Sequence, residues 1–449
     1  MRYILICFLF FPFVAISQQY DSTASIKLVH VSFDTNYYAR TVCDTLQIRE
    51  AYDSIYKKVN RPNWRPYLTI EKKRTDSIRN VKSCQAFIDT VISDNSYKTT
   101  VWTYTLKSKA QLTGNATRQS DWVDTSTAGM NVMYFRNVPV IVLRMDWADL
   151  QPTETGSLNT SYIDKYVIWA NRVNAQYGLK IKFKLRLVTG VGSPDWVKKK
   201  VGTFILTSEG YEDVSGLNWR DSNCVKFWTS AFMPCFDNLM NKLSKKYDTS
   251  LMISEVVNSA TATGTGEALI RAVSNSGGGL KRKNSYLAAG YTIQTDFDAV
   301  IASINVMAKY WKKTNIGMAI TLWETIDSKK VQKDSVRSRQ VAEYLCKTFG
   351  VRAVIGNNGL GTPGWETGGD ETKLGQMFMK MKATYGNYIY YQTAAPAKMI
   401  SPIKDILNLG LVYGSSLVEL PEPPNKILQR LTQGELLIYN QAYQNNGSR

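Results

Sequence analysis

The pattern of apolar residues along the chain changes near residue 130. After this point, short and almost continuously apolar runs alternate with amphipathic stretches that have the 3.6-residue period of helices. Strands that are apolar on both faces are typical of parallel sheets, because helices cover such sheets on both sides. The residues from about 130 onward therefore predict an α/β domain built around a parallel sheet.

Seven runs in this region are predicted to be strands: 138–145, 179–188, 250–257, 315–323, 351–357, 387–393 and 409–420. Predicted helices cover 161–177, 223–247, 295–312, 335–349, 370–385, 402–408 and 425–443. An eighth strand is expected at 131–135 or in the weakly patterned residues before it. Roughly 320 residues with eight strands fit a (β/α)8 (TIM) barrel. An open doubly wound sheet is the alternative, but no strand is followed by the glycine-rich turn of dinucleotide-binding folds.

The chain before the barrel divides into two further parts. Residues 1–17 carry one early basic residue, then an apolar run that ends in small residues, which predicts a cleaved signal peptide. A short N-terminal anchor is the alternative. Residues 18–128 contain β-branched and aromatic runs between polar turns, and they predict a small β-rich domain that ends in a linker. The barrel is then expected over 129–449, in a protein that is secreted, periplasmic or held at the cell surface.

Histidine and cysteine usage narrows the chemistry. The chain has a single histidine, His30, outside the predicted barrel. Histidine-dependent triads and zinc sites are therefore not expected there, and acid–base chemistry falls mainly to carboxylates, lysine or tyrosine. No CxxC pair occurs, and neither a metal nor another cofactor is predicted. Export would permit disulfides; local pairing would join Cys224 to Cys235 and Cys43 to Cys84, although spacing does not determine connectivity.

The chain is strongly basic, with 55 Lys and Arg against 37 Asp and Glu and a formal charge of +18. Small basic clusters occur at 198–200, 281–283 and 312–313. A basic face favours acidic polysaccharides or anionic cell surfaces, and a merely soluble basic surface is the simpler interpretation. Nucleic acid is not a predicted partner, because no recognition motif is present. The sequence does not indicate an oligomeric state, and the mature chain is expected to contain no transmembrane segment.

Reacting groups of such a barrel gather at the carboxyl ends of its strands. Tryptophans, carboxylates and amides occur at or after the predicted strand ends, together with one arginine: Arg144, Trp147, Trp196, Glu267, Trp323, Glu324, Asn358, Gln392 and Glu419. Tryptophan rings suit the C–H faces of sugars, while amides and carboxylates suit their hydroxyls. Two carboxylates are also what cleavage of a glycosidic bond requires. These residues indicate a carbohydrate substrate.

Three motifs resemble the (β/α)8 glycoside hydrolases of the β-galactosidase-like type. WADLQPTETG (147–156) is similar to the family pattern W-x-x-L-x-P-x-x-x-G, and SPDWV (193–197) is similar to its Pro-x-Trp loop. GTGEALIR (264–271) resembles the family's turn that ends in Gly-Glu and carries the acid/base glutamate. The resemblance covers roughly residues 130–420. It implies an acid/base glutamate, Glu267, after the fourth strand and a nucleophile on the seventh.

The chain departs from this family at two positions. If an early strand precedes residue 138, the seventh strand ends in Gln392, and an amide cannot act as a carboxylate nucleophile. Gln151 also stands where the family usually has glutamate before the proline. Glu419 is the candidate for the second carboxylate, and Glu324 is an alternative.

The first hypothesis is a secreted glycoside hydrolase. Glu267 would protonate the leaving oxygen and Glu419 would be the second carboxylate. Arg144, Asn358 and Gln392 would bind hydroxyls, while Trp147, Trp196 and Trp323 would stack on sugar rings. The second hypothesis is a carbohydrate-binding barrel protein that has lost its nucleophile. Each of these side chains also has a purely structural interpretation, as a packing or rim residue, and a third hypothesis places attachment to surfaces in the N-terminal domain.

Overall fold

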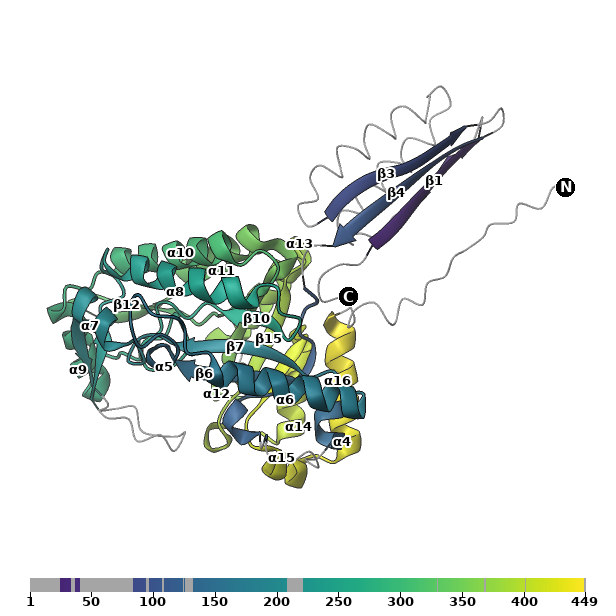
Figure 1. The fold of residues 1–449 in the computed structure, drawn as a ribbon. Helices are drawn as coiled ribbons and strands as arrows, with labels where there is room; N and C mark the ends of the chain where they lie inside the picture. The colour runs from purple at the N-terminus through teal and green to yellow at the C-terminus, as the bar shows by residue number, and fades with distance from the viewer. Residues whose placement is uncertain are drawn as a thin grey trace. The chain divides into compact units, whose positions relative to one another are not determined.

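The computed structural model divides the chain into two compact units, residues 1–110 and 111–449 (Figure 1). The residues that it describes are 25–33, 37–40, 84–93, 97–106, 109–123, 125, 132–207, 221–328, 330–366, 369–399 and 401–447. The predicted signal peptide at 1–17 lies outside the described residues.

The first unit contains a four-stranded antiparallel sheet. Its strands are β1 (Ser25–Phe33), β2 (Tyr37–Arg40), β3 (Cys84–Ser93) and β4 (Tyr97–Leu106), in the order β2-β1-β4-β3. The β4 sequence YKTTVWTYTL is rich in β-branched and aromatic residues, which favour a pleated strand. The single histidine, His30, lies in β1 and therefore belongs to this unit.

The second unit contains a closed barrel of eight parallel strands, so the predicted fold class is confirmed. The strands are β5 (Gly114–Thr117), β6 (Val140–Asp146), β7 (Lys182–Val188), β10 (Ile253–Val257), β11 (Asn315–Ala319), β14 (Ala353–Leu360), β15 (Tyr388–Thr393) and β16 (Leu417–Leu420). They neighbour one another in chain order, and β16 closes the ring by pairing with β5, Leu417 opposite Gly114.

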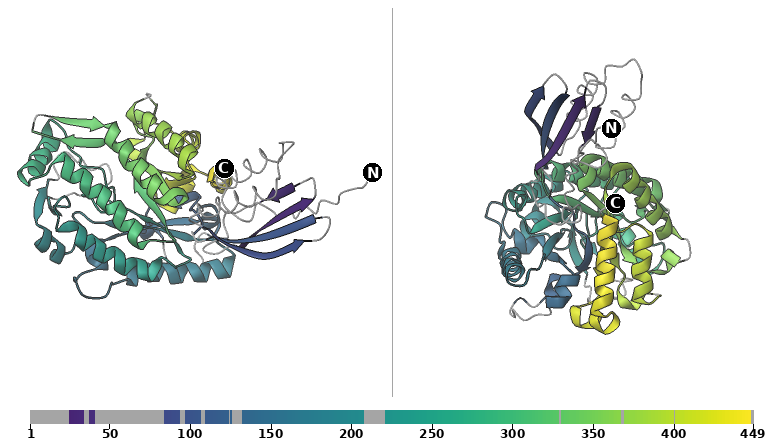
Figure 2. Two further views of the ribbon diagram at one scale, coloured as in Figure 1. Left: turned by 90° about the horizontal axis from the view of Figure 1, so that it is seen from above. Right: turned by 90° about the vertical axis from the view of Figure 1, so that its right-hand side faces the viewer.

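Helices surround this barrel (Figure 2). The longer ones are α6 (Ser161–Tyr177), α8 (Phe232–Tyr247), α9 (Gly277–Ala288), α10 (Ile293–Tyr310), α11 (Ser335–Phe349), α13 (Asp370–Tyr385), α14 (Ile403–Val412) and α16 (Gln433–Gly447). Shorter ones are α4 (Val132–Asn137), α5 (Trp147–Leu150), α7 (Asp195–Val201), α12 (Pro363–Glu366) and α15 (Pro424–Arg430). The predicted helices at 161–177, 335–349 and 370–385 have the observed bounds of α6, α11 and α13. Their apolar stripes pack on the outward faces of the strands and form the main core.

The eighth strand is the early one, β5. It lies within the segment predicted to be a linker, and residues 131–135 fall in or next to the helix α4 instead. The barrel unit therefore begins at Gln111, before the predicted boundary at 129. The four residues GNAT contain little apolar character, so their sequence alone does not indicate a strand. They form one because their backbone pairs with β16 and β6.

Other differences are local. The run 409–420 begins as the end of α14 and becomes strand only at β16. The run 315–323 ends as a barrel strand at Ala319; β12 (Trp323–Ile326) then pairs with β13 (Val331–Asp334) in a small separate sheet. The predicted helix 223–247 starts with β9 (Ser222–Val225), which pairs with β8 (Thr203–Leu206). The predicted final helix is divided into α15 and α16.

Side chains alternate between the barrel interior and the helices. A small apolar group packs inside the barrel: Leu112, Ala116, Val140, Ala319, Val354, Tyr390 and Leu417. Charged and amide side chains share the interior with this group, and they are described below. Glycines allow two close approaches inside the barrel. An added Cβ on Gly317 would meet Glu255 Oε1 at 2.2 Å, and one on Gly356 would meet the Tyr390 carbonyl oxygen at 2.0 Å.

We expect Gly356→Ala to destabilise the barrel by about 1–3 kcal/mol, because the new methyl group overlaps the backbone of the neighbouring strand β15. Urea unfolding followed by circular dichroism measures the change. Gly434→Ala in α16 is the matched control; an added Cβ there meets only Thr432 Oγ1, at 3.9 Å, so its stability should be equal or slightly higher. Equal stabilities of the two variants would contradict the close strand approach.

The structure also bears on the predicted disulfides and on membrane-spanning helices. Cys224 and Cys235 are buried free thiols, so the predicted pairing between them is wrong. The Cys235 thiol donates instead to the Ala231 carbonyl, and burial raises the pKa of Cys224 to about 12. Cys43 lies outside the described residues. Among the described residues, no helix combines the length and apolar character that crossing a bilayer needs.

Candidate functional site

An ionic cluster lies in the interior of the barrel, and its centre is Lys184 on β7. The Lys184 Nζ atom lies 2.9 Å from Glu255 Oε1 and 3.2 Å from Glu419 Oε1. It also lies 3.3 Å from the centre of the Tyr390 ring, in a cation–π contact. The side chains of Lys184, Glu255 and Glu419 are 0–1% exposed. Removal of any one of these charges would leave another charge buried without its partner.

Arg186 lies one step nearer the carboxyl ends on the same face of β7. One guanidinium nitrogen donates to Glu419 Oε1 at 2.6 Å, and the other donates to Gln392 Oε1 at 2.8 Å. Burial alone would raise the pKa of Glu419, but Arg186 and Lys184 outweigh it and hold the pKa below its usual value. Glu419 is therefore ionised at neutral pH. Burial also raises the pKa of Glu255, and the ion pair with Lys184 opposes this rise.

Glu267 lies at the mouth, on the loop that follows β10. It is half-buried, and its Oε1 accepts a hydrogen bond of 2.6 Å from Asn358 Nδ2 on β14. Asn358 Oδ1 in turn accepts from the Tyr390 hydroxyl at 3.0 Å. The other carboxylate oxygen of Glu267, Oε2, has no hydrogen-bond partner among the described residues. The contacts therefore fix one oxygen of this carboxylate and leave the second available.

Three arginines occupy three neighbouring strands at this mouth. Arg118 follows β5, Arg144 lies on β6, and Arg186 lies directly opposite Arg144 in the pairing of β6 with β7. Arg118 and Arg144 are half-buried. Burial lowers the pKa of both, and the positive charge of Arg186 lowers each further. Glu267 acts in the opposite direction on both, which places its charge near the arginines.

Trp147 on α5 and Trp196 on α7 were predicted to stack on sugar rings, but both pack against other protein groups. Trp147 is fully buried; its Nε1 donates to Gln151 Oε1 at 3.0 Å, and its ring meets Trp196 edge to face. The Trp196 Nε1 donates to the Gln151 carbonyl at 3.0 Å. The stacking role expected for Trp147 is therefore wrong, because no face of its ring is open. Trp196 is half-buried and bound to the same turn.

Trp323 and Glu324 are likewise structural. Trp323 is 1% exposed and lies against Phe297. Glu324 Oε2 accepts from the backbone nitrogens of Arg271 and Val273, at 3.1 and 3.5 Å, so it holds the end of the loop that carries Glu267. The Arg271 side chain is itself buried in a two-bond pair with Asp296. The predicted direct contacts of Trp323 and Glu324 with substrate are not supported by this arrangement.

Glu419 also differs from its predicted role. Its side chain has an exposed fraction of 0%, and its Oε1 is engaged by both Lys184 and Arg186. Its Oε2 is buried with no hydrogen-bond partner among the described residues. A carboxylate enclosed in this way cannot reach a substrate at the mouth while Arg186 keeps its position. In this structure Glu419 is a counter-ion of the barrel interior.

Sequence reasoning missed Arg118, Lys184, Arg186, Glu255 and Tyr390. One signal was available: KFKLRLV in β7 alternates cations with apolar residues, so that Lys184 and Arg186 share the inward face of a strand whose burial is almost complete. Arg118 had no comparable signal, because the strand before it was not recognised.

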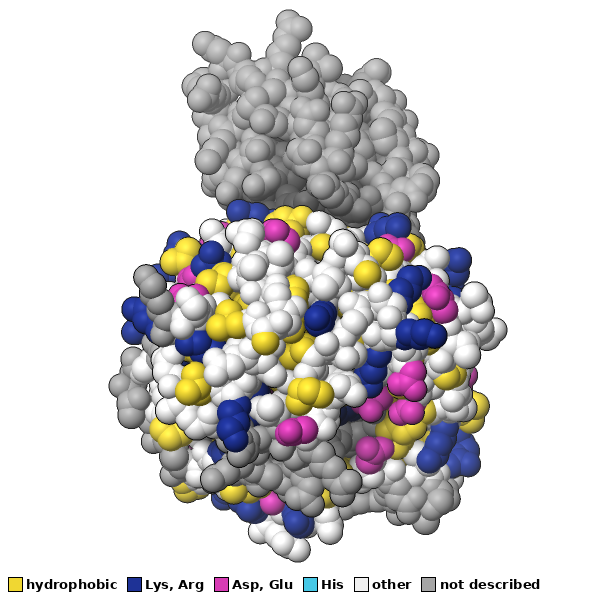
Figure 3. All heavy atoms as spheres, turned by 90° about the vertical axis from the view of Figure 1, so that its left-hand side faces the viewer, with side chains coloured by type: hydrophobic (Ala, Val, Ile, Leu, Met, Phe, Trp, Pro, Cys, Tyr) yellow, Lys and Arg dark blue, Asp and Glu magenta, His cyan; other side chains and the backbone are white. Residues whose placement is uncertain are grey.

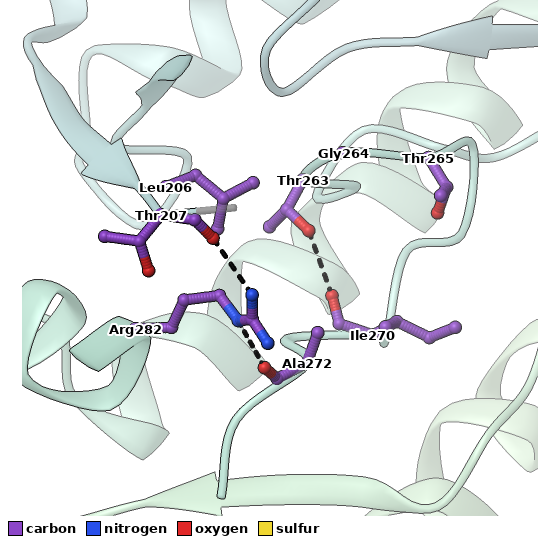
Figure 4. Close-up of a pocket in the computed structure, with 8 residues that line it drawn as sticks. All are labelled: Leu206, Thr207, Thr263, Gly264, Thr265, Ile270, Ala272 and Arg282. Atoms are coloured by element: carbon purple, nitrogen blue, oxygen red, sulfur yellow. Dashed lines mark hydrogen bonds between the residues drawn. The ribbon is translucent and has the colours of Figure 1, made fainter. Parts of the chain in front are cut away.

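Figure 3 shows the face of the molecule at which α7 and α9 lie, where basic and acidic side chains are interspersed. One predicted basic cluster, 281–283, is partly internal: Arg282 is 3% exposed and donates to the carbonyls of Thr207 and Ala272. Arg282 lines a small pocket beside the loop that carries Glu267, together with Thr263 and Thr265 (Figure 4). Its guanidinium thus serves to connect loops.

No group of three or more histidine, cysteine, aspartate or glutamate side chains in the part of the chain that the structure describes is arranged to hold a metal ion. The candidate site consists of guanidinium, amide, phenol and carboxylate groups. Such groups can bind hydroxyls and oxyanions and can transfer a proton.

No family model matches this chain, and no curated protein matches its sequence. Among solved structures, it is similar to the catalytic domain of β-amylase from Paenibacillus polymyxa, with 11% identity over 75% of this chain and 98% of that one, at a TM-score of 0.44. Endo-glycoceramidase II from Rhodococcus sp. has 10% identity over 70% and 74%, at a TM-score of 0.41. β-Galactosidase from Marinomonas ef1 has 11% identity over 69% and 53%, at a TM-score of 0.40.

Proposed function

We propose that this protein is an exported, carbohydrate-active barrel protein of the glycoside hydrolase type, with Glu267 as its proton donor. The observation that supports this proposal is the position of Glu267. It follows the fourth barrel strand, as the sequence resemblance implies for the acid/base residue, and it is half-buried at the mouth with one oxygen held by Asn358. The amide and guanidinium groups around it are suited to sugar hydroxyls.

The Glu267–Asn358–Tyr390 contacts suit a general acid. The Asn358 amide fixes Oε1, and the Tyr390 hydroxyl fixes the amide, so the carboxyl group keeps one orientation. The proton would be carried on Oε2 and given to the glycosidic oxygen as the bond from that oxygen to the anomeric carbon breaks. The same carboxylate would recover a proton from water afterwards.

The second half of the reaction needs a nucleophile at the anomeric carbon. Glu419 is ionised but enclosed beneath Arg186, and Gln392 is an amide, so a covalent sugar–enzyme step is not supported. We infer instead that water attacks. Asp146, exposed at the carboxyl end of β6 on the same face as Arg144, would take the proton that this water releases. The surrounding protein removes part of the hydration of the Asp146 carboxylate; this loss and the neighbouring Asp149 raise the pKa of Asp146, which increases its basicity.

A substrate screen tests the proposal. The full chain is incubated with neutral and acidic polysaccharides and with aryl glycosides, and new reducing ends or released phenol are measured. At least one substrate should be cleaved, and Glu267→Gln should slow the cleavage by about two to four orders of magnitude. Cleavage that Glu267→Gln leaves intact would remove the proposed proton donor.

Asn358→Ala is expected to lower kcat about tenfold to a hundredfold while KM changes little, because Asn358 orients Glu267 and makes no bond to the breaking glycosidic linkage. Steady-state kinetics on the best substrate of the screen separates the two constants. A rise in KM with an unchanged kcat would show that Asn358 binds substrate instead.

Binding without hydrolysis is the second candidate function. It is favoured by Gln392, which lies near the carboxyl end of the seventh strand, where the hydrolases that the sequence resembles carry their nucleophile, and by the enclosure of Glu419. This function predicts that the wild-type protein binds a saccharide in calorimetry, releases no reducing ends from it, and binds it equally well as Glu267→Gln.

A further inference from the structure

Of the three arginines at the mouth of the barrel, two have no ion-pair or hydrogen-bond partner in the described part of the protein. Arg186 is engaged by Glu419 and Gln392. Arg118 and Arg144, in contrast, have neither an ion pair nor a hydrogen bond to any of the described residues. Both are half-buried; Arg118 directly follows β5, and Arg144 lies on the adjacent strand β6, which pairs with β7. A guanidinium that is partly removed from water and has no partner in the protein is costly unless a ligand supplies the counter-charge.

Neighbouring carboxylates offset part of this charge but form no bond with either arginine among the described residues. Asp146, on the same face of β6, raises the pKa of Arg144 without forming an ion pair with it there. Glu267 gives one oxygen to Asn358, and Asp121 accepts the Tyr162 hydroxyl at 2.6 Å. Glu419 is buried and already forms ion pairs with Lys184 and Arg186. Burial lowers the pKa of Arg118, and Arg186 and Arg144 lower it further while Glu419 and Glu267 raise it. The arginines therefore repel one another across the mouth, and nothing in the described part of the protein ties Arg118 or Arg144 down.

We propose that Arg118 and Arg144 bind an oxyanion substituent of the saccharide, a carboxylate or a sulfate group, so that the substrate class is an acidic glycan. This inference rests on the proposed function, because it names the substrate of the same mouth. A guanidinium presents several N–H donors in a fixed plane, which matches the oxygens of these groups in two parallel hydrogen bonds. Two guanidiniums on adjacent strands would hold one such group between them, beside Glu267.

Matched pairs of polymers test this inference with the full chain. Polygalacturonate is compared with its methyl ester, which has the same backbone without charge, and dextran sulfate is compared with dextran. Affinities are measured by calorimetry at 150 mM salt. The wild-type protein should bind the charged member of at least one pair about tenfold or more tightly than the neutral member. The pair that shows the preference identifies the group as carboxylate or sulfate.

Two double variants separate a site from general attraction to a basic protein. Arg118→Met with Arg144→Met should reduce the preference to about twofold or less, and its melting temperature should be equal or higher, because the repulsion at the mouth is relieved. Lys312→Gln with Lys313→Gln removes the same amount of charge next to the amino end of β11, at the opposite end of the barrel. This variant should keep the wild-type preference for the charged polymer.

Four results would overturn the inference. Equal loss of preference in both double variants would show general electrostatic attraction, and a large drop in the melting temperature of the arginine variant would show a structural role. Binding of neutral glycans without any preference for charge would reject the acidic class and leave the proposed function standing. Failure to bind any glycan would reject both.

Discussion

Glu267→Gln is expected to reduce the turnover of any substrate of this protein by about two to four orders of magnitude, with the melting temperature unchanged. Glutamine keeps the shape of glutamate and an oxygen that accepts from Asn358, so the hydrogen bond at 2.6 Å retains its partner. What the amide cannot do is give a proton to a leaving oxygen. Substrate affinity should therefore stay the same, and the decrease in turnover should appear in kcat.

Glu343→Gln on α11 provides the matched control. It makes the same chemical change on a surface helix, where Glu343 contacts Arg339 at 3.2 Å. Turnover and melting temperature should both remain those of the wild type. Differential scanning fluorimetry measures the melting temperatures of the two variants, and single-turnover kinetics measures their rates of cleavage. Turnover retained by a normally folded Glu267→Gln protein would show that another group protonates the leaving oxygen.

Periodicity was sufficient to predict most of the longer helices and most strands, although α9 was not predicted. The segments at 161–177, 335–349 and 370–385 are amphipathic over four turns or more, and the packing of their apolar faces on the barrel agrees with that pattern. The strand β5 could not be found in this way, since GNAT has almost no apolar side chains and is a strand because β16 and β6 hydrogen-bond to it. Ring closure is a long-range constraint that a local pattern does not contain.

The candidate site shows a similar division. Glu267 and Asn358 were both predicted, and the structure brings their side chains together although 91 residues separate them. The sequence could thus predict that both residues lie near the carboxyl ends of barrel strands. Whether its side chain is open to a ligand could not: Trp147 and Glu419 lie near strand ends, yet each is fully enclosed by partners from elsewhere in the chain. Those partners, such as Arg186 for Glu419, depend on tertiary packing.

Lys184→Met is expected to destabilise the protein by about 3–5 kcal/mol at pH 7. The substitution leaves Glu255 without its cation and deprives Glu419 of one of two, while both carboxylates stay 0–1% exposed. It also removes the cation–π contact with Tyr390. Methionine fills most of the vacated volume, so the loss reflects uncompensated charge more than a cavity. Urea unfolding at constant protein concentration measures it.

Two comparisons distinguish buried charge from a packing defect. Lys184→Met with Glu255→Gln removes the cation together with its most dependent carboxylate, so most of the lost stability should return. Lys200→Met breaks the exposed pair with Glu154 and should leave the unfolding midpoint unchanged. A double variant as unstable as Lys184→Met alone would show that the side-chain shape of Lys184, not its charge, matters.

The pH dependence gives the sharpest test of this ionic cluster. Burial already raises the pKa of Glu255 in the wild type, where Lys184 opposes the rise. Without Lys184, that pKa moves further above the unfolded value of about 4.3. The folded variant then binds more protons than the unfolded chain between these two values, and its stability increases as the pH falls through the folded pKa. The difference in unfolding free energy between wild type and Lys184→Met should therefore narrow between pH 7 and pH 5. A difference that stays constant over this range would mean that Glu255 does not take up a proton when its cation is removed, and that the cluster is not held together by charge.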